Sequence, residues 1–466
     1  MKKFAIVYGN TDSEIQKNAV AELTRILLDY TMEYPVCLAY DETADLSDYR
    51  CIYLGTKAGH PYIRKASAAV LSQKESYYIH VQADTIIIEG FDDAGVLYGV
   101  MDFYCKYIVR HEHPHDDRYW VNFLEQESLP AFDYGSAPSV RERGLWTWGH
   151  VIYDYKGYLD HMMRLKMNTV IIWNDFLPIN AREIVSYAHA RNIRVIWGYA
   201  WLWDTDCSRF DLRALEGMPE QIFEQYEREY ADAGGDGIYF QTFTELGKDN
   251  INGVLIAEAA AKFVNQTSAL FFEKYPDMEI QFGLHATSVK NRLEFIAAVD
   301  PRVRIVWEDC GAFPFNYVPG RVSDFEETRE FVHAIGCLRG ADDRFGAVTK
   351  GLVKLDWSAF KHPEGPQYMG VSSEYVKRNR VERKQRIWRY IQAQWFAHGD
   401  KALEMVREMA LLKKGDLCLC GLVEDGMFEE NIMYPVALYG EMLWDAEADI
   451  KTLMSEVALR SYVKYA

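Results

Sequence analysis

The spacing of apolar and polar residues over the first hundred positions predicts a small α/β domain. Short apolar runs at 4–8 (FAIVY) and 51–55 (CIYLG) predict strands, and 77–90 predicts a hairpin. Apolar residues recur at helical spacing after the first run, and Asp92 and Asp93 can cap a helix over 94–108. Strands alternating with helices in this way indicate a sheet covered by helices.

The next segment, residues 109–140, lacks this periodicity and predicts a linker. It holds three prolines and the run HEHPH at 111–115. Three histidines at this spacing hold a metal only if the segment is extended and another ligand comes from elsewhere, and Pro114 excludes a helix interior. We therefore expect a solvated loop here, between a domain over 1–108 and a larger one over 141–466.

From residue 141 onward, predicted strands alternate with predicted helices. The expected strands are 143–152, 168–175, 193–201, 237–245, 279–287, 303–310, 346–357 and 416–426. Eight such strands over some 300 residues fit a closed (β/α)8 TIM barrel followed by C-terminal helices. An open, doubly wound sheet is the alternative, but the glycine fingerprint that often follows its first strand is absent.

In such a barrel the active site lies at the carboxyl ends of the strands. The residues that this rule brings together are Trp148, His150, Asn174, Asp175, Trp203, Asp204, Glu245, His285, Thr287, Glu308, Asp309, Asp356, Trp357, Glu424 and Asp425. Carboxylates are frequent among them, and cleavage of a glycosidic bond needs two carboxyl groups. The sequence therefore predicts a glycoside hydrolase.

Strand alternation narrows the choice of carboxylates. Gln241 is poorly suited to the helix-facing side of a strand, so we expect it to point inward together with Glu245. Glu245 is the first candidate for the general acid. Glu308 and Asp309 point to opposite sides of their strand, and the pattern does not decide which of them is the second carboxylate.

Composition supports a carbohydrate substrate and argues against other partners. Aromatic residues make up 14% of the 466-residue chain, with 12 Trp and 31 Tyr, and the apolar faces of sugars pack on such rings. Trp146/Trp148 and Trp201/Trp203 are candidate platforms, although core packing is the alternative for the deeper Trp146 and Trp201. The net charge of -18 argues against nucleic acid.

No run of about 18 apolar residues predicts a membrane span, and no convincing export signal precedes the first strand. We therefore expect a cytoplasmic protein with reduced cysteines. Cys418 and Cys420 share one strand face, but no second pair completes a zinc site, so neither a metal nor another cofactor is expected. The oligomeric state is not predicted.

The barrel opening RERGLWTWGHVIYDYKGYLDHMMRLKMNTVIIWND (141–175) resembles that of the β-N-acetylhexosaminidases, with an Arg-Gly pair in the first strand and a helix of the form LD-M-RLKMN. EIVSYAHARNIRVIWGYAW (183–201) continues the likeness. IIIEGFDDAGVLYGVMDF (86–103) is similar to the end of the small domain before the barrel in hexosaminidases and in the α-glucuronidases of xylan breakdown.

The resemblance implies roles for single residues. Arg143 would hold sugar hydroxyls in the innermost subsite, and Glu245 would match the general acid after the fourth strand. Hexosaminidases carry an aspartate immediately before that glutamate, to orient the substrate acetamido group, whereas this chain has Thr244. The α-glucuronidases match better here, because they use a lone glutamate acid with base carboxylates from later strands. Recognition of a uronate would need cations, for which Lys350, Lys354 and Arg143 are candidates.

Overall fold

The computed structural model describes residues 2–111, 124, 126–148, 152–174, 176–202, 212–245, 248–284, 289–308, 314, 325–354, 364–370, 374–412, 416–423 and 428–466. Contacts between Cα atoms divide the chain into two units. The first comprises Met1–Pro138, His189–Asn192 and Lys451–Ser461, and the second comprises Ser139–Ala188, Ile193–Ile450 and Tyr462–Ala466.

The first unit contains a six-stranded sheet of order β2-β1-β3-β5-β4-β6. Its strands are β1 (Lys3–Tyr8), β2 (Val36–Ala39), β3 (Tyr49–Thr56), β4 (Tyr77–Ala83), β5 (Thr85–Gly90) and β6 (Leu129–Ser136). The first four in the sheet order run parallel, whereas β4 is antiparallel to both of its neighbours. The predicted strands and the predicted hairpin are therefore confirmed.

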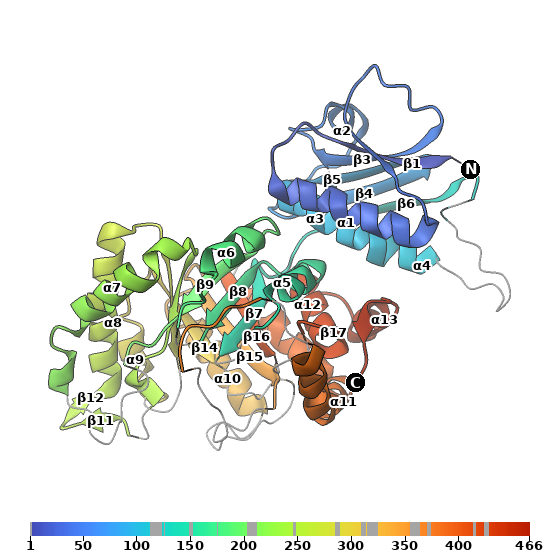
Figure 1. Cartoon of the computed structure of the whole chain (residues 1–466). Coiled ribbons are helices and arrows are strands. Elements are labelled where there is room, and N and C mark those ends of the chain that lie inside the picture. The colour runs from blue at the N-terminus through green and yellow to red at the C-terminus, as the bar shows by residue number, and fades with distance from the viewer. Residues whose placement is uncertain are drawn as a thin grey trace. The chain divides into compact units, whose positions relative to one another are not determined.

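Helices cover both faces of this sheet. They are α1 (Glu14–Thr31), α2 (Pro61–Ala66), α3 (Asp93–Asp102), a π-helical turn over Phe103–Ile108, and α4 (Val109–His111). Figure 1 shows α1 and α3 together on one face and α2 on the other. The Asp92 carboxylate accepts a hydrogen bond from the Gly95 N–H, as the capping prediction requires.

The predicted linker is wrong at residues 129–136, which form strand β6. This strand pairs antiparallel with β4, from Tyr77 opposite Ser136 to Ala83 opposite Leu129. It lies at the edge of the sheet, and its residues alternate between half-buried and exposed after Leu129. An edge strand needs few apolar residues, so its sequence resembles a loop. Of the HEHPH run, only His111 lies within the described residues.

The second unit is built on a closed barrel of eight parallel strands in the order β10-β13-β14-β15-β16-β7-β8-β9 (Figure 1). The strands are β7 (Glu142–Trp148), β8 (Thr169–Trp173), β9 (Arg194–Gly198), β10 (Gly237–Phe240), β13 (Glu279–Leu284), β14 (Val303–Glu308), β15 (Phe345–Leu352) and β16 (Leu417–Val423). All eight predicted strands are present, so the TIM-barrel prediction is confirmed and the open-sheet alternative is wrong.

Helices follow or flank these strands. They are α5 (Tyr155–Arg164), α6 (Ala181–His189), α7 (Met218–Glu229), α8 (Ile256–Lys274), α9 (Leu293–Ile296), α10 (Phe325–Gly336), α11 (Glu374–Leu412) and α12 (Tyr434–Trp444). Helix α13 (Ile450–Ala458) belongs to the first unit from Lys451 onward. Shorter elements are the 3₁₀ turns η3 (Leu212–Leu215), η4 (Ala231–Ala233) and η5 (Phe243–Glu245), the hairpin of β11 (Asn250–Ile251) and β12 (Val254–Leu255), and the parallel pair of β17 (Ile432–Met433) and β18 (Val463–Lys464).

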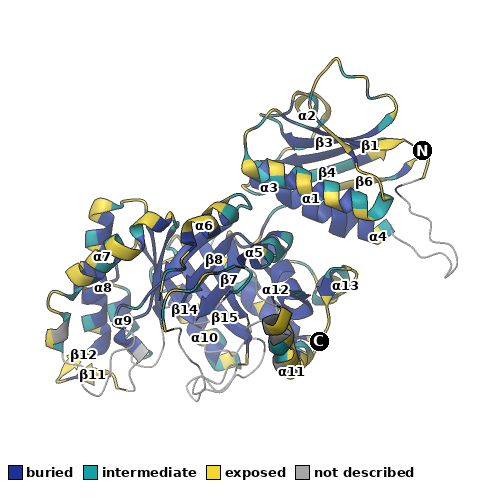
Figure 2. Cartoon of the chain, in the orientation of Figure 1, coloured by how far each residue is buried: buried dark blue, intermediate teal, exposed yellow. Residues whose placement is uncertain are grey.

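Large side chains fill the barrel interior. Trp146, Trp148, Trp173 and Tyr239 belong to one buried cluster with branched aliphatic residues from neighbouring strands. Figure 2 shows the barrel strands as buried and the outer faces of α7 and α8 as largely exposed. The barrel is therefore a packed core, and chemistry has to occur at one of its ends.

The amino-terminal end of the barrel is closed by a buried network of charges. Arg304 of β14 is fully buried and forms ion pairs with Glu142, Glu279 and Asp416. Glu279 also pairs with Arg344. Burial acts to raise the pKa of Glu279, but Arg304, Arg344 and Arg194 outweigh it and lower that pKa to about 2. This paired network leaves the opposite end of the barrel for a ligand.

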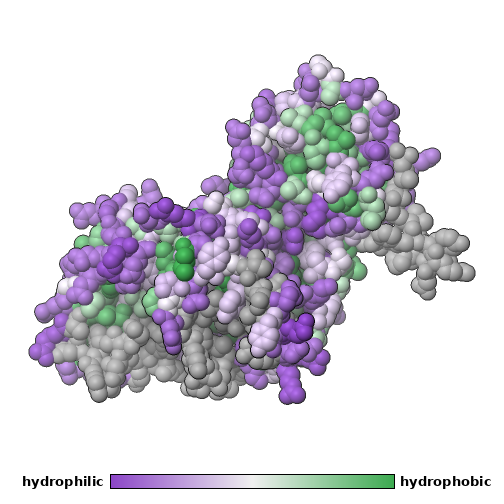
Figure 3. Space-filling model, viewed as in Figure 1, coloured by the Kyte–Doolittle hydropathy of each residue, from purple (hydrophilic) through white to green (hydrophobic). Residues whose placement is uncertain are grey.

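Figure 3 shows one face of the molecule, on which hydrophilic residues predominate and apolar residues gather in patches. Within the described residues, no helix combines the length and apolar character needed to cross a membrane. The same residues contain no group of three or more His, Cys, Asp or Glu side chains arranged to hold a metal.

Candidate active site at the barrel mouth

Glu308 occupies the carboxyl end of β14, and its side chain is completely buried inside the barrel. Its Oε1 atom accepts hydrogen bonds from the Tyr239 hydroxyl, at 2.6 Å, and from the Gln241 side-chain amide. Its Oε2 atom accepts one from the Lys350 ammonium group, at 2.7 Å. Three strands, β10, β14 and β15, thus converge on one carboxylate.

A glycine makes this convergence possible. Gly283 lies on β13, between the strands that carry Tyr239 and Glu308. A Cβ atom at this position would come within 2.1 Å of the Tyr239 hydroxyl and 3.0 Å of Glu308 Oε1. The hydrogen bond from Tyr239 to Glu308 therefore requires the absence of a side chain at position 283.

Two of the donors around Glu308 are the Tyr239 hydroxyl and the Lys350 ammonium group. Burial, followed by the charge of Glu308, raises the pKa of Tyr239 well above its ordinary value, so its hydroxyl remains protonated and donates. Lys350 and Glu308 form an ion pair in which both side chains are at most 5% exposed. The Lys350 ammonium also lies 5.5 Å from the centroid of the Trp146 ring, within range of a cation–π interaction.

Aromatic side chains from β7 and β8 line the same region. The rings of Trp146 and Trp173 each lie 5.7 Å from the ring of Tyr239. Trp148, at the end of β7, is also buried in this cluster. Asn174 follows β8 directly and is buried. The site thus combines a carboxylate, an ammonium group and indole rings.

Of the two carboxylates that the sequence left as alternatives, the structure describes Glu308. Val306 and Glu308 face the barrel interior, whereas Trp307 points outward and packs against Phe331 of α10 at 4.8 Å between ring centroids. Glu308 is therefore inside the barrel. Asp309 lies outside the described residues.

The prediction for β10 is confirmed in part. Gln241 points inward, as its hydrogen bond to Glu308 shows. The strand, however, ends at Phe240, and η5 follows. Phe243 consequently packs on Phe263 of α8, so the expected alternation through Thr244 to Glu245 is wrong. Glu245 is the last residue of η5, and the position of its side chain is not described.

Arg143 does not take the role implied by the resemblance. Its guanidinium group donates to the carbonyl oxygens of Val140, Arg141 and Lys166, and it lies 5.1 Å from the Trp444 ring centroid. Along β7, Trp146 and Trp148 face the interior, so Arg143 has the opposite parity. The expectation that it contacts a sugar from inside the barrel is therefore wrong.

Of the remaining predicted residues, the structure describes Trp201 and Lys354, and the others lie outside the described residues. Trp201 stacks on Phe240 at 3.6 Å and packs near α8, which is core packing outside the barrel. Lys354 is exposed, with its ammonium group 4.0 Å from the Tyr390 ring centroid. Outside the described residues lie His150, Asp175, Trp203, Asp204, His285, Thr287, Asp309, Asp356, Trp357, Glu424 and Asp425.

Sequence reasoning missed Tyr239 and Gly283. Tyr239 has the same strand parity as Gln241, so the argument that turned Gln241 inward could have included it. No pattern within β13 marks Gly283, because its role depends on the two neighbouring strands.

The two cysteines of β16, Cys418 and Cys420, lie in the barrel interior. Their sulfur atoms are 3.9 Å apart, and both are free thiols. A hydrogen bond with Cys418, followed by burial, raises the pKa of Cys420 well above its ordinary value, so this thiol remains protonated.

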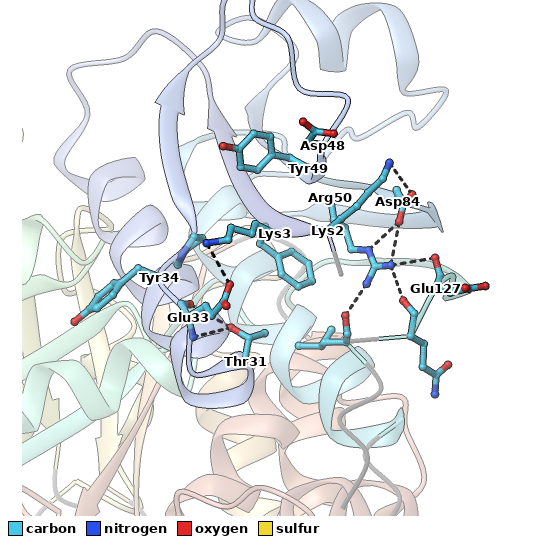
Figure 4. Close-up of a pocket in the computed structure, with 14 residues that line it drawn as sticks. Lys2, Lys3, Thr31, Glu33, Tyr34, Asp48, Tyr49, Arg50, Asp84 and Glu127 are labelled. Atoms are coloured by element: carbon cyan, nitrogen blue, oxygen red, sulfur yellow. Dashed lines mark hydrogen bonds and ion pairs between the residues drawn. The ribbon is translucent and has the colours of Figure 1, made fainter.

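A cavity of about 1010 Å³ lies in the first unit and is shown in Figure 4. Arg50 is buried at its wall, pairs with Asp84, and donates to the carbonyl oxygens of Leu124 and Gln126. Lys2 also pairs with Asp84. These interactions hold the Arg50 side chain in place at the wall of the cavity.

Comparison with known proteins supports the architecture. The sequence matches no family model. The structure is similar to that of CpGH84B, with a TM-score of 0.55 and 11% identity, over 98% of this chain and 70% of that one. It is also similar to a GH138 enzyme targeting pectin rhamnogalacturonan II, with a TM-score of 0.53 and 12% identity, over 97% of this chain and 52% of that one.

The chain thus spans about half the length of the GH138 enzyme. Both proteins bear glycoside hydrolase names, so the present fold is one that glycoside hydrolases use. At this level of identity the likeness shows the fold alone, and the chemistry has to be argued from the site.

Proposed function

We propose that the protein is a glycoside hydrolase that removes a terminal sugar, with Glu245 as the general acid and Glu308 or Asp309 as the second carboxylate. The observation that carries this proposal is the buried Glu308 carboxylate at the carboxyl end of β14, held by three donors. Active sites of TIM barrels lie at this end.

The acid assignment rests on position. Glu245 ends the turn that directly follows β10, the fourth barrel strand in chain order. A general acid must be protonated at the working pH, whereas its partner must be ionised. The ion pair with Lys350 stabilises the ionised form of Glu308, which suits a base or nucleophile. Asp309 remains the alternative for this role.

Other residues around the mouth are proposed to bind the sugar. Trp148 and Asn174 are buried at the ends of β7 and β8. The further candidates from the sequence are His150, Asp175, Trp203, His285, Lys354 and Trp357. Arg143 is removed from this set because its guanidinium group is bound to backbone carbonyls away from the interior.

An α-glucuronidase-like activity on uronate side chains is the second candidate, and Lys350 favours it. A buried ammonium group at the mouth is suited to recognising a sugar carboxylate. Lys350 already forms an ion pair with Glu308, so the carboxylate of a uronate would have to bind the same ammonium group. A neutral or N-acetylated sugar needs no such sharing, which keeps the hexosaminidase-like interpretation open.

A panel of nitrophenyl glycosides tests the proposal, with N-acetylhexosaminides and uronides measured separately. We expect the wild type to cleave at least one substrate and Glu245→Gln to lose about 10²-fold or more in kcat/KM on it. The exposed Glu273→Gln on α8 is the matched control and should retain full activity. A wild type that binds sugars but cleaves none would be a non-catalytic carbohydrate-binding barrel and would contradict the proposal.

Rescue by azide identifies the second carboxylate. In Glu308→Ala or Asp309→Ala the small anion can enter the vacated space and restore turnover of an activated substrate. Rescue of one variant assigns the role to the residue removed. If both variants keep wild-type rates while Asp175→Ala loses activity only on N-acetylated sugars, the substrate acetamido group is the nucleophile and the two-carboxylate mechanism is wrong.

A further inference from the structure

Two loops on the carboxyl side of the barrel are fastened together by Asn180. This residue ends the loop between β8 and α6, and its side chain is buried. Its amide nitrogen donates to the Met369 carbonyl at 3.2 Å, and its amide oxygen accepts from the Met369 N–H at 3.0 Å. Ile179 N–H donates to the Gln367 carbonyl at 2.9 Å. Residues 364–370 are thereby held against the loop that follows β8.

This contact lies on the side of the barrel where catalysis is proposed. The segment 364–370 belongs to the connection from β15 to α11, and β15 carries Lys350. The loop that it meets begins at Asn174, directly after β8. In the barrel order, β16 and β7 separate β15 from β8. Residues 364–370 therefore contact the loop of a strand that is not a neighbour of β15 in the barrel.

Residues 364–370 expose an aromatic ring to solvent. Tyr368 is 58% exposed, although its neighbour Met369 is completely buried. The ring lies against the backbone of Gly370, since a Cβ atom there would come within 2.5 Å of Tyr368 Cε1. Ile179, from the opposite loop, is 69% exposed. An aromatic ring supported in this way keeps part of its surface available to a ligand.

We propose that Tyr368 forms a stacking platform for the group on the leaving side of the scissile bond, an aryl aglycone or the next sugar. The inference rests on the proposed glycosidase function and adds a subsite to it. Both kinds of group offer a flat or apolar face, and a supported ring binds such a face with little loss of side-chain entropy. Asn180 is a positioning residue for this platform and does not touch the reacting atoms.

Two substrates of the same sugar test the platform. A nitrophenyl glycoside carries an aromatic leaving group, whereas the corresponding glycosyl fluoride has none. We expect Tyr368→Ala to raise KM for the nitrophenyl glycoside about tenfold, with little change for the fluoride. Gly370→Ala should give the same selective change because its new methyl group displaces the ring. Asn180→Ala should change KM in the same direction.

The matched control is Tyr34→Ala, which removes an exposed tyrosine from the first unit and should alter neither substrate. Equal losses on both substrates in Tyr368→Ala would indicate a merely structural role and overturn the inference while leaving the hydrolase intact. Unchanged KM values for both would also overturn it. A wild type that cleaves neither substrate overturns the proposed function and this inference together.

Discussion

At the scale of single residues, the site depends on what surrounds Glu308. Tyr239 and Lys350 each donate to a different oxygen of its carboxylate, and Gly283 leaves the space in which Tyr239 can do so. The sequence predicted that Gln241 faces inward, because a polar side chain is poorly suited to the helix-facing side. It did not predict Gly283, because the close approach arises only when β10, β13 and β14 lie side by side in the closed barrel.

Gly283→Ala tests this arrangement. The added methyl group would push the Tyr239 hydroxyl away from Glu308, so we expect kcat to fall by about tenfold or more, as for a displaced catalytic contact. Overpacking should also lower the free energy of unfolding by about 1–3 kcal/mol. Activity on the substrate identified by the glycoside panel and urea unfolding measure the two effects.

Gly346→Ala is the matched control. Its Cβ atom would lie 3.0 Å from the Cys418 carbonyl oxygen and 3.2 Å from Val306 Cγ2, closer to the charged floor than to Glu308. We expect comparable destabilisation with kcat largely retained. If both variants lose activity in proportion to their stability, the space at position 283 has no special role in the site.

At the scale of secondary-structure elements, periodicity predicted all eight barrel strands but not where each one ends. The apolar and polar alternation of 237–245 continues past Phe240, although the backbone turns into η5. Tertiary contacts, such as Phe243 on α8, decide such an end, and local sequence does not contain them. Edge strand β6 was missed for the opposite reason, since one partner strand and a half-exposed face demand little apolar sequence.

The floor network makes a prediction about pH. The pKa of Glu279 is about 2 in the folded protein, against 4.5 for an ordinary glutamate. A lowered carboxylate pKa stabilises the fold above the unfolded-state value, and that stability is lost as pH falls toward the folded-state value. We therefore expect Glu279→Gln to be less stable than the wild type by about 3 kcal/mol at pH 7.

The difference in the free energy of unfolding between the wild type and Glu279→Gln should depend on pH. It should shrink by about half between pH 4.5 and pH 3, because the unfolded wild-type chain takes up a proton on Glu279 in this range while the folded protein, with its lower pKa, remains mostly ionised. Urea unfolding of both proteins across this range provides the measurement. A difference that stays constant down to pH 3 would mean that Arg304, Arg344 and Arg194 do not hold Glu279 in its ionised form.

At the scale of the whole molecule, the sequence established the architecture and the end of the barrel where chemistry is expected. The small domain, the barrel and their order followed from alternating periods and from the resemblance at 86–103 and 141–201. Roles of individual residues transferred less well. Arg143 has the expected neighbours in sequence, yet its strand parity and backbone hydrogen bonds direct it away from the interior. Such a role depends on which side of the strand the side chain faces in the closed barrel, and a short sequence motif does not determine that side.

The central claim is that Glu245 protonates the leaving group of a glycoside. The most direct test compares two aryl glycosides of the same sugar, a 2,4-dinitrophenyl glycoside that needs little protonation and a 4-nitrophenyl glycoside that needs more. We predict that Glu245→Gln keeps kcat/KM for the first within about tenfold of wild type and loses about 10²–10⁴-fold on the second. Equal losses on both substrates, or no loss on either, would contradict the account.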